Sequence, residues 1–146
     1  MLLLTGCQTA TNQKQLINGP EHQWLYDNWN FSEAVKVGNQ IWLSGQVGYD
    51  SNTKSYPDSL EEQTELVFKN IERILKQAGA TMEDIVEITS YHTDISKIGT
   101  VTQVKKRFIP KDFPAWTAVE ITGLARPKIQ IEIKVVAVIG AGKAHL

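Results

Sequence analysis

The chain has 146 residues, of which 42% are hydrophobic and 21% charged, so it is long enough for one globular domain with its own core. Fifteen Lys and Arg residues oppose sixteen Asp and Glu residues, and the net charge of −1 lacks the basic excess of a nucleic-acid-binding protein. The basic cluster at residues 105–107 lies in a helical pattern and is predicted to be a solvated helix face. One cysteine excludes an internal disulfide, and three scattered histidines lack metal-ligand spacing, so no metal site is predicted.

The N-terminus departs from this ordinary composition. Residues 2–6 are first apolar and then small, and Cys7 follows them, as at the cleavage site of a bacterial lipoprotein. We therefore expect a lipid anchor at Cys7 and a location in the cell envelope or periplasm. Residues 1–20 would be a signal remnant and polar tether, and residues 21–146 the folded domain. Because no Lys or Arg precedes Cys7, the alternative is an apolar N-terminus on a cytoplasmic protein.

The first half of the domain is predicted to contain three strands. Residues 22–27 are a short mixed run that is interpreted as the first strand. Residues 34–37 and 40–47 form two more strands, joined by the turn Gly38-Asn39 as in a hairpin. Ser44-Gly45 interrupts the last of these strands, which indicates a bulge or a close backbone approach.

Two helices and three strands are predicted in the rest of the chain. The first helix follows two good N-cap residues, Asp58 and Ser59, has an apolar stripe and ends at Gly79. Residues 85–93 are rich in β-branched residues and predict a strand, and residues 98–108 predict a second helix that Pro110 ends. With two closing strands, the order β-β-β-α-β-α-β-β indicates an α+β fold with two helices on one face of a mixed sheet.

The closing strands, residues 113–121 and 129–138, are expected to be neighbours that form one wall of a site. Strict alternation in the second strand directs its isoleucines to the core and Glu132 to the other face. The first strand places Trp116 and Glu120 on a common face. Such a wall would have an acid on each strand. The mixture of apolar and charged residues on the face opposite the helices indicates burial by another subunit.

Several short segments occur in the order and at the spacing typical of one family. They are residues 37–39, 42–47, 62–64, 70–71, 78–80, 84–86, 93–94, 113–115, 118–120 and 131–133. Over roughly residues 31–138 the chain resembles the Rid/YjgF family, the reactive-intermediate deaminases. The resemblance implies a chorismate-mutase-like fold and a homotrimer whose sheets close into a barrel, with a small-molecule cleft at each subunit interface. Active members of the family hydrolyse 2-imino acids and their enamine tautomers to 2-keto acids and ammonia, without a cofactor or metal.

The resemblance also implies which residues line the cleft. In active members an arginine after Pro-Ala binds the substrate carboxylate through two hydrogen bonds, and the matching residue here is Trp116. The acid that activates water is retained as Glu132. The other matched positions are the backbone of Ser44 and Gly45, Phe31 for a tyrosine, Thr102 for an asparagine and Ala118 for a cysteine.

These replacements lead to two functional hypotheses. The first is a homotrimer that binds a small molecule, aromatic or cationic in view of Trp116, and lacks the standard 2-imino acid deaminase activity. The alternative is an imine or enamine hydrolase for a different, aromatic or non-anionic substrate, with Glu132 as acid and base. Arg126 could replace the missing arginine or stay on the surface, and Glu120 could line the cleft or make a structural hydrogen bond. An endoribonuclease, the third possibility, conflicts with the absence of a basic face.

Overall fold

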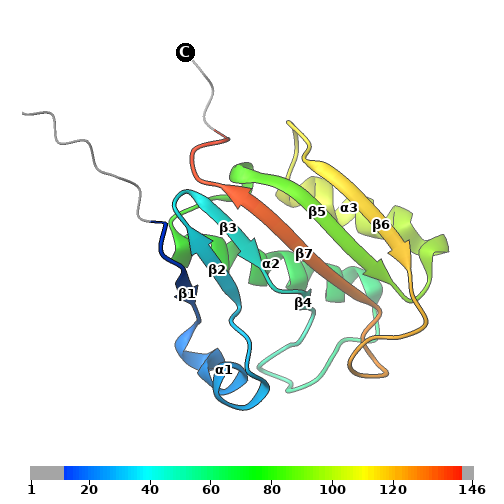
Figure 1. Ribbon diagram of the computed structural model, residues 1–146. Coiled ribbons are helices and arrows are strands. Elements are labelled where there is room, and N and C mark those ends of the chain that lie inside the picture. The colour runs from blue at the N-terminus through cyan, green and yellow to red at the C-terminus, as the bar shows by residue number, and fades with distance from the viewer. Residues whose placement is uncertain (1–11, 143–146) are drawn as a thin grey trace, which may run out of the picture.

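The computed structural model describes residues 12–142, which form one twisted sheet with helices on one face (Figure 1). The strands are β1 (Gln15–Ile17), β2 (Ala34–Val37), β3 (Gln40–Leu43), β4 (Gln46–Val47), β5 (Ile85–His92), β6 (Ala115–Glu120) and β7 (Ile131–Val138). The helices are α1 (Gln23–Trp29), α2 (Leu60–Ala78) and α3 (Ile98–Phe108). The strand order is β1-β2-β3-β7-β5-β6, and β4 also pairs with β7. Because β5 and β6 are parallel and the other pairs antiparallel, the predicted mixed sheet is confirmed.

Helix α2 joins the helix layer to the sheet. It begins after Ser59, whose side chain accepts a hydrogen bond from the Glu62 N–H, and it ends at Gly79, whose φ of 87° is left-handed. Phe68 of α2 stacks on Phe108 of α3 with ring centroids 5.3 Å apart, so the two helices form one layer. The predicted apolar stripe is buried throughout, at Val67, Ile71, Ile74, Leu75 and Ala78.

Strand β7 lies in the middle of the sheet and has two different faces. Its alternate residues Ile131, Ile133, Val135 and Ala137 are buried on the helix side. The residues between them, Glu132, Lys134, Val136 and Val138, are half-buried on the other side. Among residues 12–142 no helix covers that side, which we call the open face (Figure 1). The predicted alternation of this strand is therefore confirmed.

The predicted first strand is wrong. Residues 22–27 form no strand, because Pro20–His22 is a 3-10 turn and Gln23–Trp29 is helix α1. A run of six mixed residues does not distinguish a strand from a short helix, and side-chain contacts four residues apart, such as Gln23 to Asp27, stabilise the helix. The first strand is instead β1, which pairs with β2 although its residues fall within the predicted tether. Cys7 lies outside the described residues.

The last two strands are not neighbours. β5 lies between β6 and β7 and pairs with both, in parallel with β6 and antiparallel to β7. The connection through α3 makes this possible, because a helical crossover returns the chain parallel to the strand before it. The predicted wall with an acid on each of two adjacent strands is therefore wrong.

The basic cluster at residues 105–107 is only partly a solvated face. Lys106 and Arg107 are exposed, but Lys105 is buried, with 7% of its surface exposed. Lys105 follows Val101 by four residues, and both residues lie on the side of α3 that faces the sheet. Its position on the helix therefore buries Lys105, although lysine is a residue type that is usually exposed to solvent.

Replacing Ile133 by alanine should strongly destabilise the fold. The side chain is 1% exposed in the central strand, and the change removes three carbons from a closely packed core. We expect a loss of about 2–5 kcal/mol in the free energy of unfolding. Chemical denaturation measures this loss, and the matched control is Lys134→Ala, on the open face of the same strand. Equal effects of the two changes would contradict the assignment of faces.

Candidate functional site

Glu132 and the Ser44-Gly45 break between β3 and β4 lie against each other. β3 and β4 both pair with β7, and Val47 is directly opposite Glu132. A methyl group placed on Gly45 would overlap the Glu132 carboxylate. Glycine is therefore required here by close approach, as the interruption of the strand predicted. The two positions that the resemblance matches to a cleft, Glu132 and Ser44-Gly45, therefore lie together within one chain.

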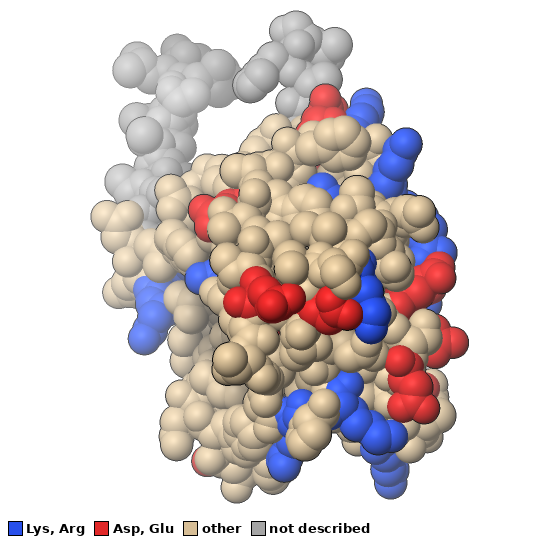
Figure 2. Space-filling model, turned by 90° about the vertical axis from the view of Figure 1, so that its right-hand side faces the viewer, with Lys and Arg blue, Asp and Glu red and all other residues tan. Residues whose placement is uncertain are grey.

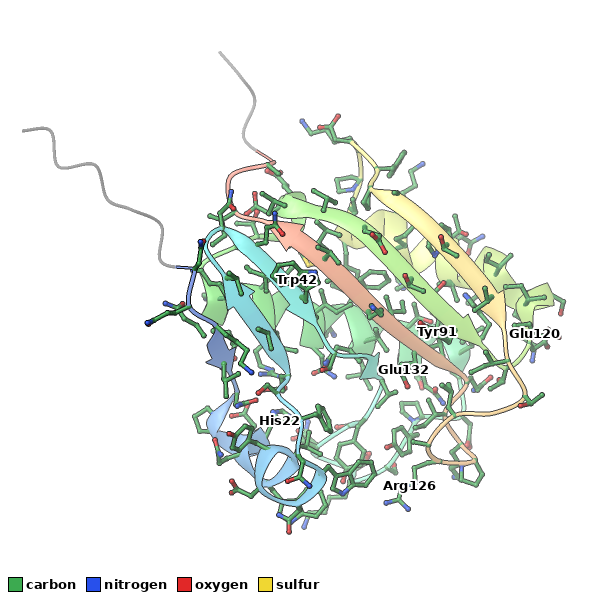
Figure 3. The ribbon with its side chains drawn as sticks, in the orientation of Figure 1. His22, Trp42, Tyr91, Glu120, Arg126 and Glu132 are labelled. Atoms are coloured by element: carbon green, nitrogen blue, oxygen red, sulfur yellow. The ribbon has the colours of Figure 1, made fainter. Side chains whose placement is uncertain are left out.

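The Glu132 carboxyl group holds its proton more strongly than an ordinary carboxyl group. It is half-buried on the open face, and burial raises its pKa above the ordinary value. No hydrogen bond or ion pair within residues 12–142 stabilises its charge. Tyr91 of β5 is directly opposite Glu132 in the pairing of the two strands, and the ring is half-buried on the same face (Figure 3).

The Ser44 wall is fixed by the segment that precedes β2. The Ser44 N–H donates to the Glu33 carbonyl at 2.9 Å, and the Ser44 hydroxyl donates to the Ser32 carbonyl at 2.7 Å. Gln46 donates from its side chain to the Ser44 carbonyl at 3.1 Å. Phe31, which replaces a tyrosine of the family, is half-buried immediately before this segment. Rotation of the Ser44 peptide groups is therefore restricted on both sides.

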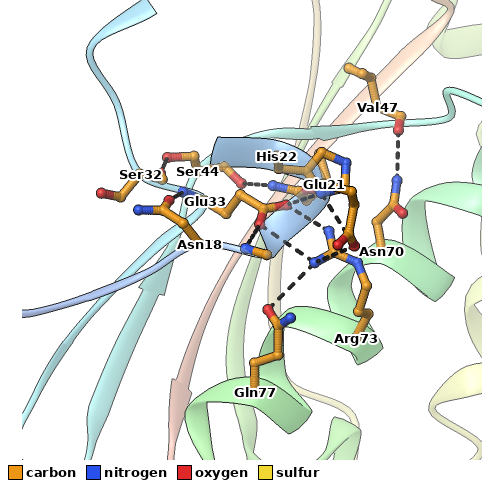
Figure 4. Close-up of polar contacts among 12 residues, drawn as sticks. Asn18, Glu21, His22, Ser32, Glu33, Ser44, Val47, Asn70, Arg73 and Gln77 are labelled. Carbon is orange, nitrogen blue, oxygen red and sulfur yellow. Dashed lines mark hydrogen bonds and ion pairs between the residues drawn. The ribbon is translucent and has the colours of Figure 1, made fainter. Parts of the chain in front are cut away.

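Glu33 is the centre of a buried polar cluster behind that wall (Figure 4). Its side chain is 3% exposed and accepts hydrogen bonds of 2.6 Å from Arg73 of α2 and from the Gly19 N–H. Asn18 accepts from the Glu33 N–H at 3.0 Å, and His22 Nδ1 lies 3.4 Å from the carboxylate. The cluster ties the segment between β1 and α1 to helix α2. Burial alone would raise the pKa of Glu33, but the hydrogen bonds and the Arg73 charge lower it overall.

Trp116 belongs to a separate group on the helix side. Its indole N–H donates to the Ser90 hydroxyl at 2.8 Å, and this hydroxyl lies 2.8 Å from His92 Nε2. Ser90 and His92 are buried, and burial lowers the pKa of His92. Trp116 is half-buried and packs against the core. The indole therefore uses its one donor inside its own chain.

The other positions matched to the family lie near Trp116. Ala118 is half-buried two residues along β6, on the same face. Thr102 is exposed on α3 and donates its hydroxyl to the Ile98 carbonyl at 3.0 Å. Because the hydroxyl donates its proton to a carbonyl of its own helix, it is a poor replacement for an asparagine amide that donates to a ligand.

Glu120 and Arg126 have local partners instead of a common site. The Glu120 carboxylate accepts a 2.8 Å hydrogen bond from the Ile95 N–H, at the turn before α3. Of the two possibilities for Glu120, lining the cleft or making a structural hydrogen bond, this contact is the structural hydrogen bond. Arg126 lies 5.9 Å from the centroid of the Trp29 ring. Burial raises the pKa of the Tyr56 hydroxyl, and the nearby Arg126 charge offsets part of this rise. Arg126 lies beyond the end of the sheet (Figure 3) and has no charge contact with Glu132.

The predicted residues therefore form two groups in one chain. Glu132, Ser44 and Gly45 lie on the open face and at the β3–β4 break, whereas Trp116 and Ala118 face the helices. Two strand spacings of about 4.8 Å separate β7 from β6, and the sheet itself lies between the two groups. A single chain does not bring the groups into one cleft.

Two residues of these groups were missed by the sequence reasoning. Tyr91 stands at an outward position of a strand that was predicted, but its neighbour across the sheet depended on the strand order. Lys105 was predicted to be exposed to solvent, although its Nζ atom lies 4.3 Å from the centroid of the Trp116 ring. Because Lys105 follows the apolar Val101 by four residues, the sequence does indicate that both side chains lie on the same, buried side of the helix.

Comparison with known proteins identifies the family. The profile of the Endoribonuclease L-PSP family matches residues 24–139. The chain belongs to this family, also called Rid/YjgF. It is 38% identical over 115 residues to the RutC family protein YjgH of Escherichia coli, covering 77% of this chain and 86% of YjgH. It is 34% identical over 111 residues to the mouse 2-iminobutanoate/2-iminopropanoate deaminase, covering 75% of this chain and 82% of the mouse protein.

The fold is shared with solved structures of the same family. Escherichia coli TdcF with bound serine superposes with a TM-score of 0.70 and 26% identity, over 74% of this chain and 87% of TdcF. The chorismate-mutase-like sheet implied by the resemblance is thus confirmed. Within residues 12–142 no helix is long and apolar enough to cross a membrane, and no three His, Cys, Asp or Glu side chains are grouped as metal ligands.

Gly45→Ala should destabilise the protein because the added methyl group displaces Glu132. We expect a loss of about 1–3 kcal/mol in unfolding free energy. The matched control is Gly99→Ala in α3, where an added methyl group meets no atom within 4 Å and should stabilise the helix slightly. The double change Gly45→Ala with Glu132→Ala should recover part of the loss. Strict additivity of the two changes would contradict the predicted overlap.

Glu33→Gln should destabilise the fold at neutral pH by about 1–3 kcal/mol, because Arg73 loses a buried charged partner. The lowered pKa means that folded Glu33 binds its proton less readily than the unfolded chain does. Its contribution is therefore complete above the ordinary carboxyl pKa and is lost as pH falls through the folded value. The difference between wild type and variant, measured by denaturation from pH 7 to pH 3, should shrink with falling pH. A constant difference would contradict this role.

Proposed function

We propose that this protein is a homotrimer that binds a small molecule between its subunits and lacks the standard 2-imino acid deaminase activity of its active relatives. The observation that carries the proposal is Trp116. It replaces the arginine of active members, and its N–H donates to Ser90 inside the chain. Neither a charge nor a free donor fork remains on this side chain for a substrate carboxylate.

The two separate groups of site residues support assembly between copies. The Glu132 group and the Trp116 group lie on opposite sides of one sheet, so a complete cleft needs the Trp116 group of one subunit beside the Glu132 group of its neighbour. The open face also has the character of an interface, since Trp42 is 41% exposed there beside the half-buried Val136 of β7, and Val119 of β6 is 39% exposed. Association through this face would cover apolar area that a single chain leaves in water.

The loss of the arginine decides against the standard reaction on energetic grounds. Each hydrogen bond to a charged group contributes about 1.5–3 kcal/mol, and a guanidinium makes two with a carboxylate. Without them the imine carbon is not held opposite the water that Glu132 would activate. Binding itself remains possible in such a cleft, and a structural relative, TdcF, has been crystallised with bound serine.

The side of the molecule that carries β6 and α3 does not favour nucleic acid as a partner. On the side of the molecule carrying β6 and α3, Lys and Arg alternate with Asp and Glu (Figure 2). A continuous basic stripe would be needed to follow a phosphate backbone. Although the name of the family profile includes an endoribonuclease, the mixed charge on this side gives RNA binding no support.

A second function, hydrolysis of a different imine or enamine, is favoured by the state of Glu132. Burial raises the pKa of this half-buried carboxyl group, which has no partner within residues 12–142, so it holds its proton to a higher pH than an ordinary carboxyl group and can act as an acid. Gly45 leaves its backbone open beside this acid. An aromatic or uncharged imine, which needs no carboxylate clamp, is the substrate class compatible with these groups. Glu132→Gln would then abolish the activity.

The proposal predicts no acceleration of 2-imino acid hydrolysis. An amino-acid oxidase generates the imines, and semicarbazide traps what remains, with the mouse deaminase as positive control. Size-exclusion chromatography with light scattering should give three times the mass of 16.4 kDa for the same sample. Hydrolysis at a rate comparable to the mouse enzyme would overturn the assignment, and a monomer would overturn the inter-subunit cleft.

A further inference from the structure

Lys105 is the most unusual charged residue outside the acidic site. It lies in the last turn of α3 with 7% of its surface exposed. Its ammonium group has no hydrogen-bond or charge partner within residues 12–142, and burial is the only influence on its pKa, which it lowers. A buried lysine normally pairs with an acid, because removing an unpaired charge from water is costly. A buried lysine without an acidic partner in the described part of its own chain therefore indicates that an anion from outside the chain binds it.

The ammonium group is held between two aromatic rings. Nζ lies 4.3 Å from the centroid of the Trp116 ring and 5.3 Å from that of Phe113. The faces of aromatic rings attract a cation, and this attraction compensates part of its lost hydration. Phe113 is 60% exposed, so the aromatic pair opens toward the surface at the edge of the sheet. His22 Nδ1 is the only enclosed side-chain nitrogen or oxygen without a partner among the described residues, so Lys105 Nζ is not sealed from solvent.

This position coincides with the place where the proposed cleft lost its cation. Trp116 occupies the strand position of the family's arginine, and Lys105 reaches the same ring from the helix. Thr102, another matched position, lies three residues earlier on α3, about one helical turn away. A positive charge on helix α3 thus lies beside the strand position at which active members of the family have their arginine.

We propose that Lys105 is the anion-binding residue of the cleft and that the ligand is a small planar carboxylate. The carboxylate accepts hydrogen bonds from the ammonium group, and the flat part of the ligand lies against Trp116 and Phe113. This inference rests on the proposed function and names its ligand class: an aromatic acid, in place of the aromatic or cationic ligand that Trp116 alone suggested. An ammonium is a point charge with three rotatable donors, whereas a guanidinium fixes the plane of a carboxylate. The site therefore binds the acid without orienting it for attack by water.

The test uses benzoate and benzamide, which share a ring and differ in charge. The full chain is labelled with ¹⁵N-tryptophan, and the indole signal of Trp116 is assigned as the one that is missing in Trp116→Phe. Benzoate should shift the Trp116 signal in a saturable titration, and benzamide should bind at least tenfold more weakly. Lys105→Met should weaken benzoate binding at least tenfold, and Lys105→Arg should keep it within a few-fold. Lys106→Met is the matched control, because Lys106 is exposed on the same helix and its loss should change nothing.

Several results would overturn the assignment of Lys105. They are equal binding of the two probes, unchanged binding in Lys105→Met, a Trp116 signal that does not move, and loss of binding in Lys106→Met equal to that in Lys105→Met. If Lys105→Met folds poorly, Lys105→Arg still tests the proposal, because it keeps the positive charge and should therefore keep benzoate binding within a few-fold. Binding of benzamide alone would overturn the role of Lys105 and leave the proposed ligand cleft intact. Failure of the proposed function is seen separately, as a monomer or as rapid hydrolysis of 2-imino acids.

Discussion

The structure depends on the pairing of one strand, β7, with three others. β3 and β4 lie along one edge of β7 and β5 along the other, so that β7 fixes the position of every central element. Its isoleucines and valine enter the core beneath the helices, which ties the register of the sheet to hydrophobic burial. A shift of one residue would expose those side chains and bury Glu132. The same constraint that stabilises the fold therefore sets the acid on the open face.

That constraint also explains why the acid has no partner in its own chain. Glu132 faces away from the helices, toward a surface whose half-buried valines and exposed Trp42 are suited to contact with another copy. The Ser44-Gly45 break lies beside it, and the Glu33 cluster behind the break holds it in place. One half of the proposed cleft is thus rigid before any ligand arrives, as a preorganised site requires.

The other half of the proposed cleft differs from the family pattern at several positions, of which Trp116 bears most on its chemistry. Trp116 fills the position of a strand arginine, and its N–H is satisfied by Ser90 and not by a ligand. Lys105 supplies a charge near the same position but from a helix, and aromatic rings replace part of its hydration. Membership of the Rid/YjgF family accounts for the fold and for Glu132. It does not determine the ligand, because the residues that would select it differ between its members.

The sequence by itself determined the local structure and the family. The alternation of β7, the caps of α2 at Ser59 and Gly79, and the interruption at Ser44-Gly45 are properties of neighbouring residues, and all were predicted. Glu132 could be named because a motif of nearby residues contains it. Only the tertiary structure placed β5 between β6 and β7, moved the first strand to Gln15–Ile17, assigned Glu120 to a turn and buried Lys105. These features depend on contacts between distant segments, whose free energy outweighs the preference of any single residue, and a local pattern does not contain that information.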